Sequence, residues 1–185
     1  MKKFSAIFLC FMLLISACFG CSVQNSENEI FIGEGKMTFF RAAISANGFL
    51  ANEVFGANHL PVDASKTITQ NNRIFAPVVS DRIKTYEDLE SLLKSTYIEE
   101  VAQKLLNEPK KYVEIDGKLY FDMQYNGQGE SNYIWDSFET KFKKLNDDGT
   151  YLFKVKLKKS NGWNSSIKIS AADIDGRFKL CDFYC

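Results

Sequence analysis

The cysteines and the single histidine carry the most specific chemistry in this sequence, because thiols and imidazoles act as nucleophiles, metal ligands and acylation sites. His59 is the only histidine among 185 residues. No local signature places it beside a cysteine as a nucleophilic pair, and one histidine without clustered ligands does not match the spacing of a zinc site. We therefore predict no catalytic residue, no metal and no cofactor, and a protein that is not an enzyme.

Two cysteines follow an N-terminal segment that is typical of export. Two lysines precede an apolar stretch at 4–15, which is shorter than the roughly 20 residues of a transmembrane helix. The sequence Ile15-Ser16-Ala17-Cys18 resembles the bacterial lipoprotein box, in which cleavage precedes an acylated cysteine. Cys21 fits less well, because bulky Phe19 stands where a small residue is needed. Cys18 is thus the predicted lipidation site, and an ordinary secretory signal cleaved nearby is the alternative.

Cleavage before Cys18 would divide the chain into a signal peptide at 1–17, a flexible tether at 18–35 and a single domain at 36–185. Fatty-acyl chains such as palmitate would then hold the protein on the extracytoplasmic face of a membrane in the bacterial cell envelope. The remaining chain has 21 basic and 23 acidic residues. This balance predicts neither a polybasic membrane patch nor a nucleic-acid partner.

Three cysteines would remain for disulfide formation, which an export compartment permits: Cys21, Cys181 and Cys185. In an extended strand the Cα atoms of Cys181 and Cys185 would lie roughly 13 Å apart. A disulfide needs about 4.4–6.8 Å, so a direct bond requires a turn at 182–184. Pairing of Cys21 with either of the other two is the alternative.

Apolar residues at helical spacing predict three helices in the first part of the domain. The first spans 36–55, and Gly48 inside it indicates close packing or a kink. Its apolar stripe consists of Phe39, Ala43, Ala46, Leu50 and Val54, and Phe40, Ile44 and Phe55 widen this stripe. After a predicted strand at 73–79, two short helices begin at capping patterns that start at Thr85 and Thr96.

From residue 111 onward the hydrophobic period changes to two, which predicts antiparallel hairpins. The predicted strand pairs are 112–116 with 118–123, 133–145 with 150–159, and 167–171 with 177–183. Helices followed by a meander indicate an α+β domain, with N-terminal helices packed on one face of a curved antiparallel sheet. The predicted common core contains Ile98, Val101, Leu105, Phe138, Phe153 and Val155.

A lysine stripe and two short motifs have ordinary structural interpretations. The stripe consists of Lys154, Lys156, Lys158 and Lys159. It predicts a solvated sheet face that discourages edge-to-edge pairing, with polyanion binding as the alternative. The sequence at 173–176 superficially resembles a calcium loop, but it lacks the remaining ligands and indicates a hairpin turn. A glycosylation sequon at 164–166 carries little weight in a bacterial lipoprotein.

The connection from Gln124 to Tyr133 is the candidate binding site. It is long for a hairpin loop and combines tyrosines, glycines and amides, a composition typical of recognition loops. The residues predicted to bind are Tyr125, Asn126, Gly127, Gln128, Gly129, Glu130 and Tyr133. A merely flexible hairpin end is the alternative.

One stretch of the chain resembles a known family. Residues 85–121, TYEDLESLLKSTYIEEVAQKLLNEPKKYVEIDGKLYF, are similar to the central block of the IseA family, secreted inhibitors of bacterial cell-wall DL-endopeptidases. The predicted helix at 39–55, the strand at 73–79 and the Asp-Gly-Lys-Leu-Tyr hairpin at 116–120 occupy matching places. The resemblance extends over residues 36–160, and it rests on patterns rather than on a catalytic signature.

The resemblance implies a two-lobed α+β protein with a cystatin-like sheet. Such a protein would act as a monomer that blocks the active-site cleft of an NlpC-type cysteine peptidase, without a cofactor. The chain departs from the family in its lipoprotein box, in residues 58–70 and in its cysteine-containing end. Two other functions stay open: a small-ligand-binding lipoprotein with a cystatin-like or nuclear-transport-factor-like fold, and a structural subunit of an envelope complex.

Overall fold

The computed structural model describes residues 32–56, 58–107, 111–125 and 131–185, and Ile32–Cys185 form one compact unit. The predicted signal peptide, Cys18 and Cys21 lie outside the described residues. No helix in the described part of the chain combines the length and the apolar composition needed to cross a bilayer.

The helices and strands follow one another in an order that separates two sheets. In chain order the elements are α2 (Glu34–Phe49), a π-helical turn (Leu50–Val54), a 3₁₀ turn (Ala64–Lys66), β1 (Ile68–Gln70), β2 (Arg73–Pro77), α3 (Tyr86–Thr96), α4 (Glu99–Asn107), β3 (Tyr112–Ile115), β4 (Lys118–Asp122), β5 (Tyr133–Leu145), β6 (Tyr151–Lys159), β7 (Asn164–Ile174) and β8 (Arg177–Leu180).

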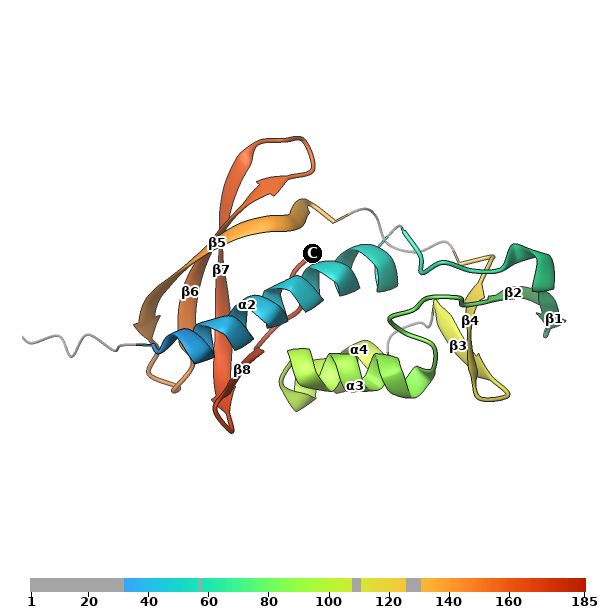
Figure 1. Ribbon diagram of the computed structural model, residues 1–185, viewed down its shortest axis with the longest axis horizontal. Coiled ribbons are helices and arrows are strands. Elements are labelled where there is room, and N and C mark those ends of the chain that lie inside the picture. The colour runs from blue at the N-terminus through green and yellow to red at the C-terminus, as the bar shows by residue number, and fades with distance from the viewer. Residues whose placement is uncertain (1–31, 57, 108–110, 126–130) are drawn as a thin grey trace, which may run out of the picture. The chain divides into compact units, whose positions relative to one another are not determined.

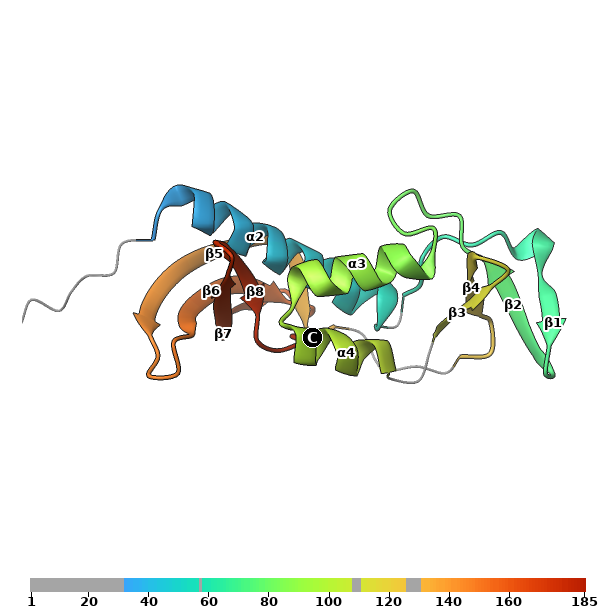
Figure 2. The same ribbon diagram turned by 90° about the horizontal axis from the view of Figure 1, so that it is seen from below.

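The fold is α+β, as predicted. Strands β5-β6-β7-β8 form a curled antiparallel sheet, and α2 lies across its concave side in contact with β5 and β8 (Figure 1). A second antiparallel sheet has the order β1-β2-β4-β3, and α3 and α4 pack together beside α2 and β8 (Figure 2). Phe40 of α2 stacks on Phe153 of β6 with ring centroids 3.8 Å apart, and Phe178 of β8 meets both rings edge-on. These rings fill the space between helix and sheet.

The buried face of α2 differs from the predicted stripe at one residue. Ala43, Ala46, Leu50 and Val54 are buried, but Phe39 is 43% exposed. Phe40, one residue on, is completely buried. Phe39 therefore lies at the edge of the buried face, and Phe40 and Ile44, which were predicted to widen the stripe, belong to its centre.

Gly48 allows α2 to approach β5 closely, as its position in the helix predicted. A Cβ atom placed on Gly48 would lie 2.3 Å from the Cβ of Trp135, whose side chain is buried. This distance is shorter than real side chains allow. The glycine is therefore required by the neighbouring strand and not by helix bending.

Gly48→Ala is expected to lower the free energy of unfolding by about 1–3 kcal/mol, because the added methyl group displaces Trp135. This is the opposite of the gain of about 1 kcal/mol that alanine brings to an open helical position. Gly35→Ala is the matched control, since nothing lies within 4 Å of a Cβ there. Urea unfolding of both variants tests the prediction, and a stabilised Gly48→Ala would contradict the packing.

The start of α3 is confirmed, and the predicted start of α4 at Thr96 is wrong. Thr85 caps α3, and its hydroxyl accepts from Asp88 N at 3.1 Å while Asp88 Oδ2 accepts from Thr85 N. Thr96 is the last residue of α3, and its hydroxyl donates to the Leu92 carbonyl. The helices separate here because Tyr97 pairs with Leu180 at the end of β8.

The three predicted hairpins form, with shifted ends in the last of them. Asp116-Gly117 and Asp175-Gly176 both have positive φ at each residue, as tight two-residue turns require. β7 (Asn164–Ile174) extends three residues beyond the predicted strand at each end, and β8 ends at Leu180, three residues before the predicted end. β1 was not predicted from the sequence; it pairs with β2 through a turn at Asn71-Asn72.

The predicted core is partly confirmed. Leu105, Phe153 and Val155 are buried in one cluster, and Val101 and Phe138 pack against it. Ile98 is half-buried and lines a surface hollow instead.

Two buried residues at the start of β3, Lys111 and Tyr112, form hydrogen bonds with the segment that follows α2. The Tyr112 hydroxyl donates to the Glu53 carbonyl at 2.9 Å and accepts from Leu60 N at 2.8 Å. The ammonium group of Lys111, which is 5% exposed, donates to the carbonyls of Gly56 and Asn58. Burial lowers the pKa of Lys111 to about 8.

Stability is expected to rise with pH above 8 because of Lys111. An unfolded lysine has a pKa near 10.4, so between pH 8 and 10 the unfolded state binds more protons than the folded state. The free energy of unfolding should rise by up to about 2 kcal/mol from pH 8 to pH 9.5. Urea unfolding across this range tests it, and Lys111→Met should remove the rise. An equal rise in Lys111→Met would assign the effect to another group.

Candidate binding surface at the start of β5

The turn that leads from β4 toward the candidate loop is fixed by Asp122. This carboxylate is 4% exposed, pairs with Arg73 and accepts from Gln124 N at 3.0 Å. The backbone carbonyl of Asp122 accepts a hydrogen bond from Tyr125 N at 3.0 Å. Tyr125 is half-buried immediately after this turn. The loop residues Asn126, Gly127, Gln128, Gly129 and Glu130 lie outside the described residues.

The far end of the loop is organised by one hydroxyl group. Ser131 Oγ accepts from Tyr133 N at 3.2 Å and from Trp135 Nε1 at 3.0 Å. The rings of Tyr133 and Trp135 meet edge to face, 5.9 Å apart. Because Trp135 is fixed against Gly48, the position of Tyr133 follows from the packing of α2 on β5.

Tyr133 lines a surface hollow of about 430 Å³. The residues around it come from the π-helical turn, the segment before Leu60, the start of β5 and the β6–β7 turn: Asn52, Asn58, Ser131, Tyr133, Ile134, Trp135, Asp136 and Ser160. Amides, hydroxyls and one carboxylate therefore surround an aromatic side chain. Such a surface can form hydrogen bonds with a peptide backbone and bury an apolar group against the rings.

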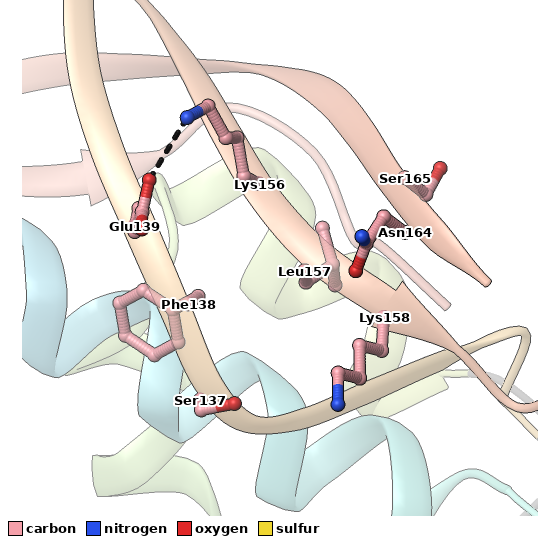
Figure 3. Close-up of a pocket in the computed structure, with 8 residues that line it drawn as sticks. All are labelled: Ser137, Phe138, Glu139, Lys156, Leu157, Lys158, Asn164 and Ser165. Carbon is pink, nitrogen blue, oxygen red and sulfur yellow. Dashed lines mark hydrogen bonds and ion pairs between the residues drawn. The ribbon is translucent and has the colours of Figure 1, made fainter. Parts of the chain in front are cut away.

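A second hollow, of about 440 Å³, lies where β5 bulges away from β6. Ile134 pairs with Lys158 and Glu139 with Lys156, so β5 advances five residues while β6 advances two. Figure 3 shows the Glu139–Lys156 pair, at 2.9 Å, at one end of this hollow, and Ser137 and Lys158 at the other. The bulge thus opens a hollow that polar side chains of β5, β6 and β7 line.

The residues with nucleophilic or ligating chemistry are not brought together. His59 stacks on Phe121 at 4.5 Å and its Nδ1 lies 2.8 Å from the Leu60 carbonyl, which gives it a packing role. Asp173, near the end of β7, pairs with Lys36 of α2. Within the described residues, no group of three or more histidine, cysteine or carboxylate side chains could hold a metal ion.

The C-terminal cysteines are free thiols, and the direct bond between Cys181 and Cys185 is not formed. Cys181 is half-buried and lines a hollow of about 290 Å³ beside α4, whereas Cys185 is exposed. Burial raises the pKa of the Cys181 thiol, so it stays protonated and weakly nucleophilic at neutral pH.

Of the predicted site residues described by the structure, Tyr133 lies in the first hollow and Tyr125 is not among the residues that line it. Asn52, Asn58 and Ser160 were missed, because nothing in their local sequence distinguishes them from other polar loop residues. Comparison with protein-family models gives no match for this chain, and comparison with curated proteins gives none either. The description of the site therefore rests on the geometry of its residues.

Proposed function

We propose that this protein is a lipid-anchored inhibitor of cell-wall DL-endopeptidases on the extracytoplasmic face of a bacterial membrane. The observation that carries the proposal is the hollow at the start of β5, where Tyr133 stands among amide, hydroxyl and carboxylate groups. The resemblance of residues 85–121 to the IseA family supplies the class of partner, an NlpC-type cysteine peptidase. The predicted lipoprotein box at Cys18 supplies the location.

An inhibitor that occupies a cleft binds more tightly when its contact side chains are held in place before binding, and this supports the two ends of the candidate loop as contact points. Tyr125 follows a turn held by Asp122, and Tyr133 is held by Ser131 and Trp135. A loop with two fixed ends loses less conformational freedom on binding than a free one. Its tyrosines offer large apolar surfaces with a hydroxyl for pairing, as in binding hot spots.

A small-molecule carrier with a cavity between helix and sheet is less well supported. The rings of Phe40, Phe153 and Phe178 occupy that space, with centroids 3.8–6.1 Å apart. All three side chains are at most 2% exposed. The two hollows beside β5 lie at the surface, which suits a protein or peptide partner.

The test is inhibition of purified NlpC-type endopeptidases by the mature chain, beginning at residue 18 and carrying Cys18→Ser. Tyr125→Ala and Tyr133→Ala should each raise the inhibition constant about thirtyfold, which corresponds to about 2 kcal/mol. Phe39→Ala is the matched control, because Phe39 is an exposed aromatic residue on α2. Circular dichroism establishes that each variant is folded.

The outcomes separate the function from the site. Absence of inhibition of every NlpC-type enzyme of the same organism at micromolar concentration would refute the inhibitor function. Inhibition that both tyrosine variants retain in full would move the interface away from this loop.

A further inference from the structure

The outer face of the large sheet carries a cluster of lysines that the fold brings together. Facing positions on neighbouring antiparallel strands lie on the same side of a sheet, about 4.5–5.5 Å apart. Lys154 of β6 pairs with Lys141 of β5 and with Lys168 of β7, forming a row of three. We call the lysine face the set Lys141, Lys144, Lys154, Lys156, Lys158 and Lys168.

Acidic side chains do not balance this face. Among its register positions in β5, β6 and β7, all of which the structure describes, Glu139 alone carries a carboxylate, and it pairs with Lys156. Within the described residues, Lys141, Lys154 and Lys168 form no ion pair. The total charge of the chain is balanced, but the fold places the lysines on one side.

Protection of a sheet edge does not explain the lysines of β6 and β7. β6 is an interior strand between β5 and β7, so its edges are already paired. Like charges at facing positions of a sheet destabilise it. A row of three lysines is therefore a cost to folding that an anionic partner would offset.

An exposed tryptophan beside the lysine face favours a lipid membrane as the anionic partner. Trp163 is 74% exposed in the turn between β6 and β7, directly before Asn164, which pairs with Lys158. Figure 1 shows this hairpin projecting beyond the rest of the large sheet. Tryptophan flanked by lysine is the combination that favours the interface between lipid headgroups and acyl chains.

The predicted tether does not restrict which face meets the membrane. The 15 peptide units from residue 18 to 33 span at most about 50 Å, roughly twice the length of a 16-residue helix such as α2. The surface chemistry of the domain can therefore determine its orientation.

We propose that the lysine face and Trp163 bind the surface of an anionic phospholipid membrane. Lysine ammonium groups attract the lipid phosphates, and Trp163 enters the headgroup region. This contact would add to the acyl anchor and hold the opposite side of the domain, with α2, toward the cell wall. The proposal does not depend on which protein, if any, the hollow at the start of β5 binds.

The test uses the mature chain from residue 18 with Cys18→Ser, so that no acyl group contributes. Flotation with phosphatidylcholine vesicles is compared with flotation with vesicles in which phosphatidylglycerol replaces part of that lipid. We expect binding to the anionic vesicles only, reduced when the salt concentration rises from about 0.1 M to about 0.5 M. The fluorescence of Trp163 should shift to the blue on binding, whereas the second tryptophan, Trp135, is already buried.

A matched pair of triple variants assigns the binding to the lysine face. The combined change Lys141→Gln, Lys154→Gln and Lys168→Gln should weaken vesicle binding about a hundredfold. The control combination is Lys84→Gln, Lys104→Gln and Lys118→Gln, which removes the same charge from exposed positions on other elements. It should bind nearly as wild type, and Trp163→Ala should lose the fluorescence shift and bind more weakly.

Three results would overturn the proposal. The first is no binding to anionic vesicles, and the second is an equal loss in the two triple variants, which would indicate diffuse charge. The third is binding of soluble polyphosphate without binding of vesicles, which would assign the face to a soluble anionic polymer. None of these results bears on endopeptidase inhibition.

Discussion

Asn47→Leu is expected to lower the free energy of unfolding by about 3–5 kcal/mol, although leucine has nearly the same volume and is more apolar. Asn47 is completely buried near the end of α2. Its Nδ2 donates to the Tyr184 carbonyl at 2.7 Å, and its Oδ1 accepts from the Tyr97 hydroxyl at 2.9 Å and from Tyr184 N at 3.1 Å. Leucine would leave the buried Tyr97 hydroxyl and two half-buried backbone groups of Tyr184 without these hydrogen bonds.

A shorter series separates the hydrogen bonds from the packing. Tyr97→Phe removes one of the three bonds and keeps the ring, so it should cost only about 1 kcal/mol. Urea unfolding followed by circular dichroism measures both variants under the same conditions. An Asn47→Leu variant no less stable than Tyr97→Phe would show that Asn47 does not connect the helix to the C-terminal segment.

The C-terminal segment shows what the sequence could not indicate. The sequence analysis continued the last strand to residue 183, whereas β8 ends at Leu180. Beyond it, Asn47 holds the backbone of Tyr184, and the Tyr184 hydroxyl accepts from Ser170 N at 3.1 Å. These contacts join residues far apart in sequence, and no local pattern encodes them.

Local signals predicted the elements well because they act within a few residues. The Thr85 capping box and the Asp-Gly turns each depend on backbone geometry that their own residues determine. Predictions failed where a distant segment intervened. Thr96 ends α3 rather than starting α4, because Tyr97 pairs with Leu180.

The candidate site was predictable only in part for the same reason. Its composition identified the loop that contains Tyr133, but Asn52 and Asn58 reach the hollow through the packing of α2 on β5. The bulge of β5 could not be predicted either, because residues 135–138 of β5 come to stand opposite Leu157 alone only once the sheet is assembled.

The lysines on the outer face of the large sheet illustrate a different limit of prediction from sequence. The stripe along β6 is visible in the sequence, and it was interpreted as a solvated face. Its meaning changes when Lys141 and Lys168 take the positions on either side of Lys154, since that register depends on both neighbouring strands. The positive charge of β6 can therefore be predicted from the sequence, whereas the positive charge of the whole face depends on the assembled sheet.

Phe40→Ala and Phe39→Ala test which face of α2 forms the core. Phe40 is completely buried, and its ring contacts Phe153 and Phe178, so Phe40→Ala should lower the free energy of unfolding by about 3–5 kcal/mol. Phe39 is 43% exposed and its ring contacts Arg177, whose guanidinium carbon lies 5.3 Å from the centroid. Phe39→Ala should therefore cost less than about 1 kcal/mol.

The two variants remove the same side chain from adjacent positions of one helix, so helix propensity affects them equally and the difference reports burial. For a domain of this size, Phe40→Ala should lower the melting temperature by roughly 10 °C, and Phe39→Ala by no more than a few degrees. Equal losses would mean that α2 is rotated on the sheet. A larger loss for Phe39→Ala would restore the stripe predicted from the sequence, and the stacking of Phe40 on Phe153 would then be wrong.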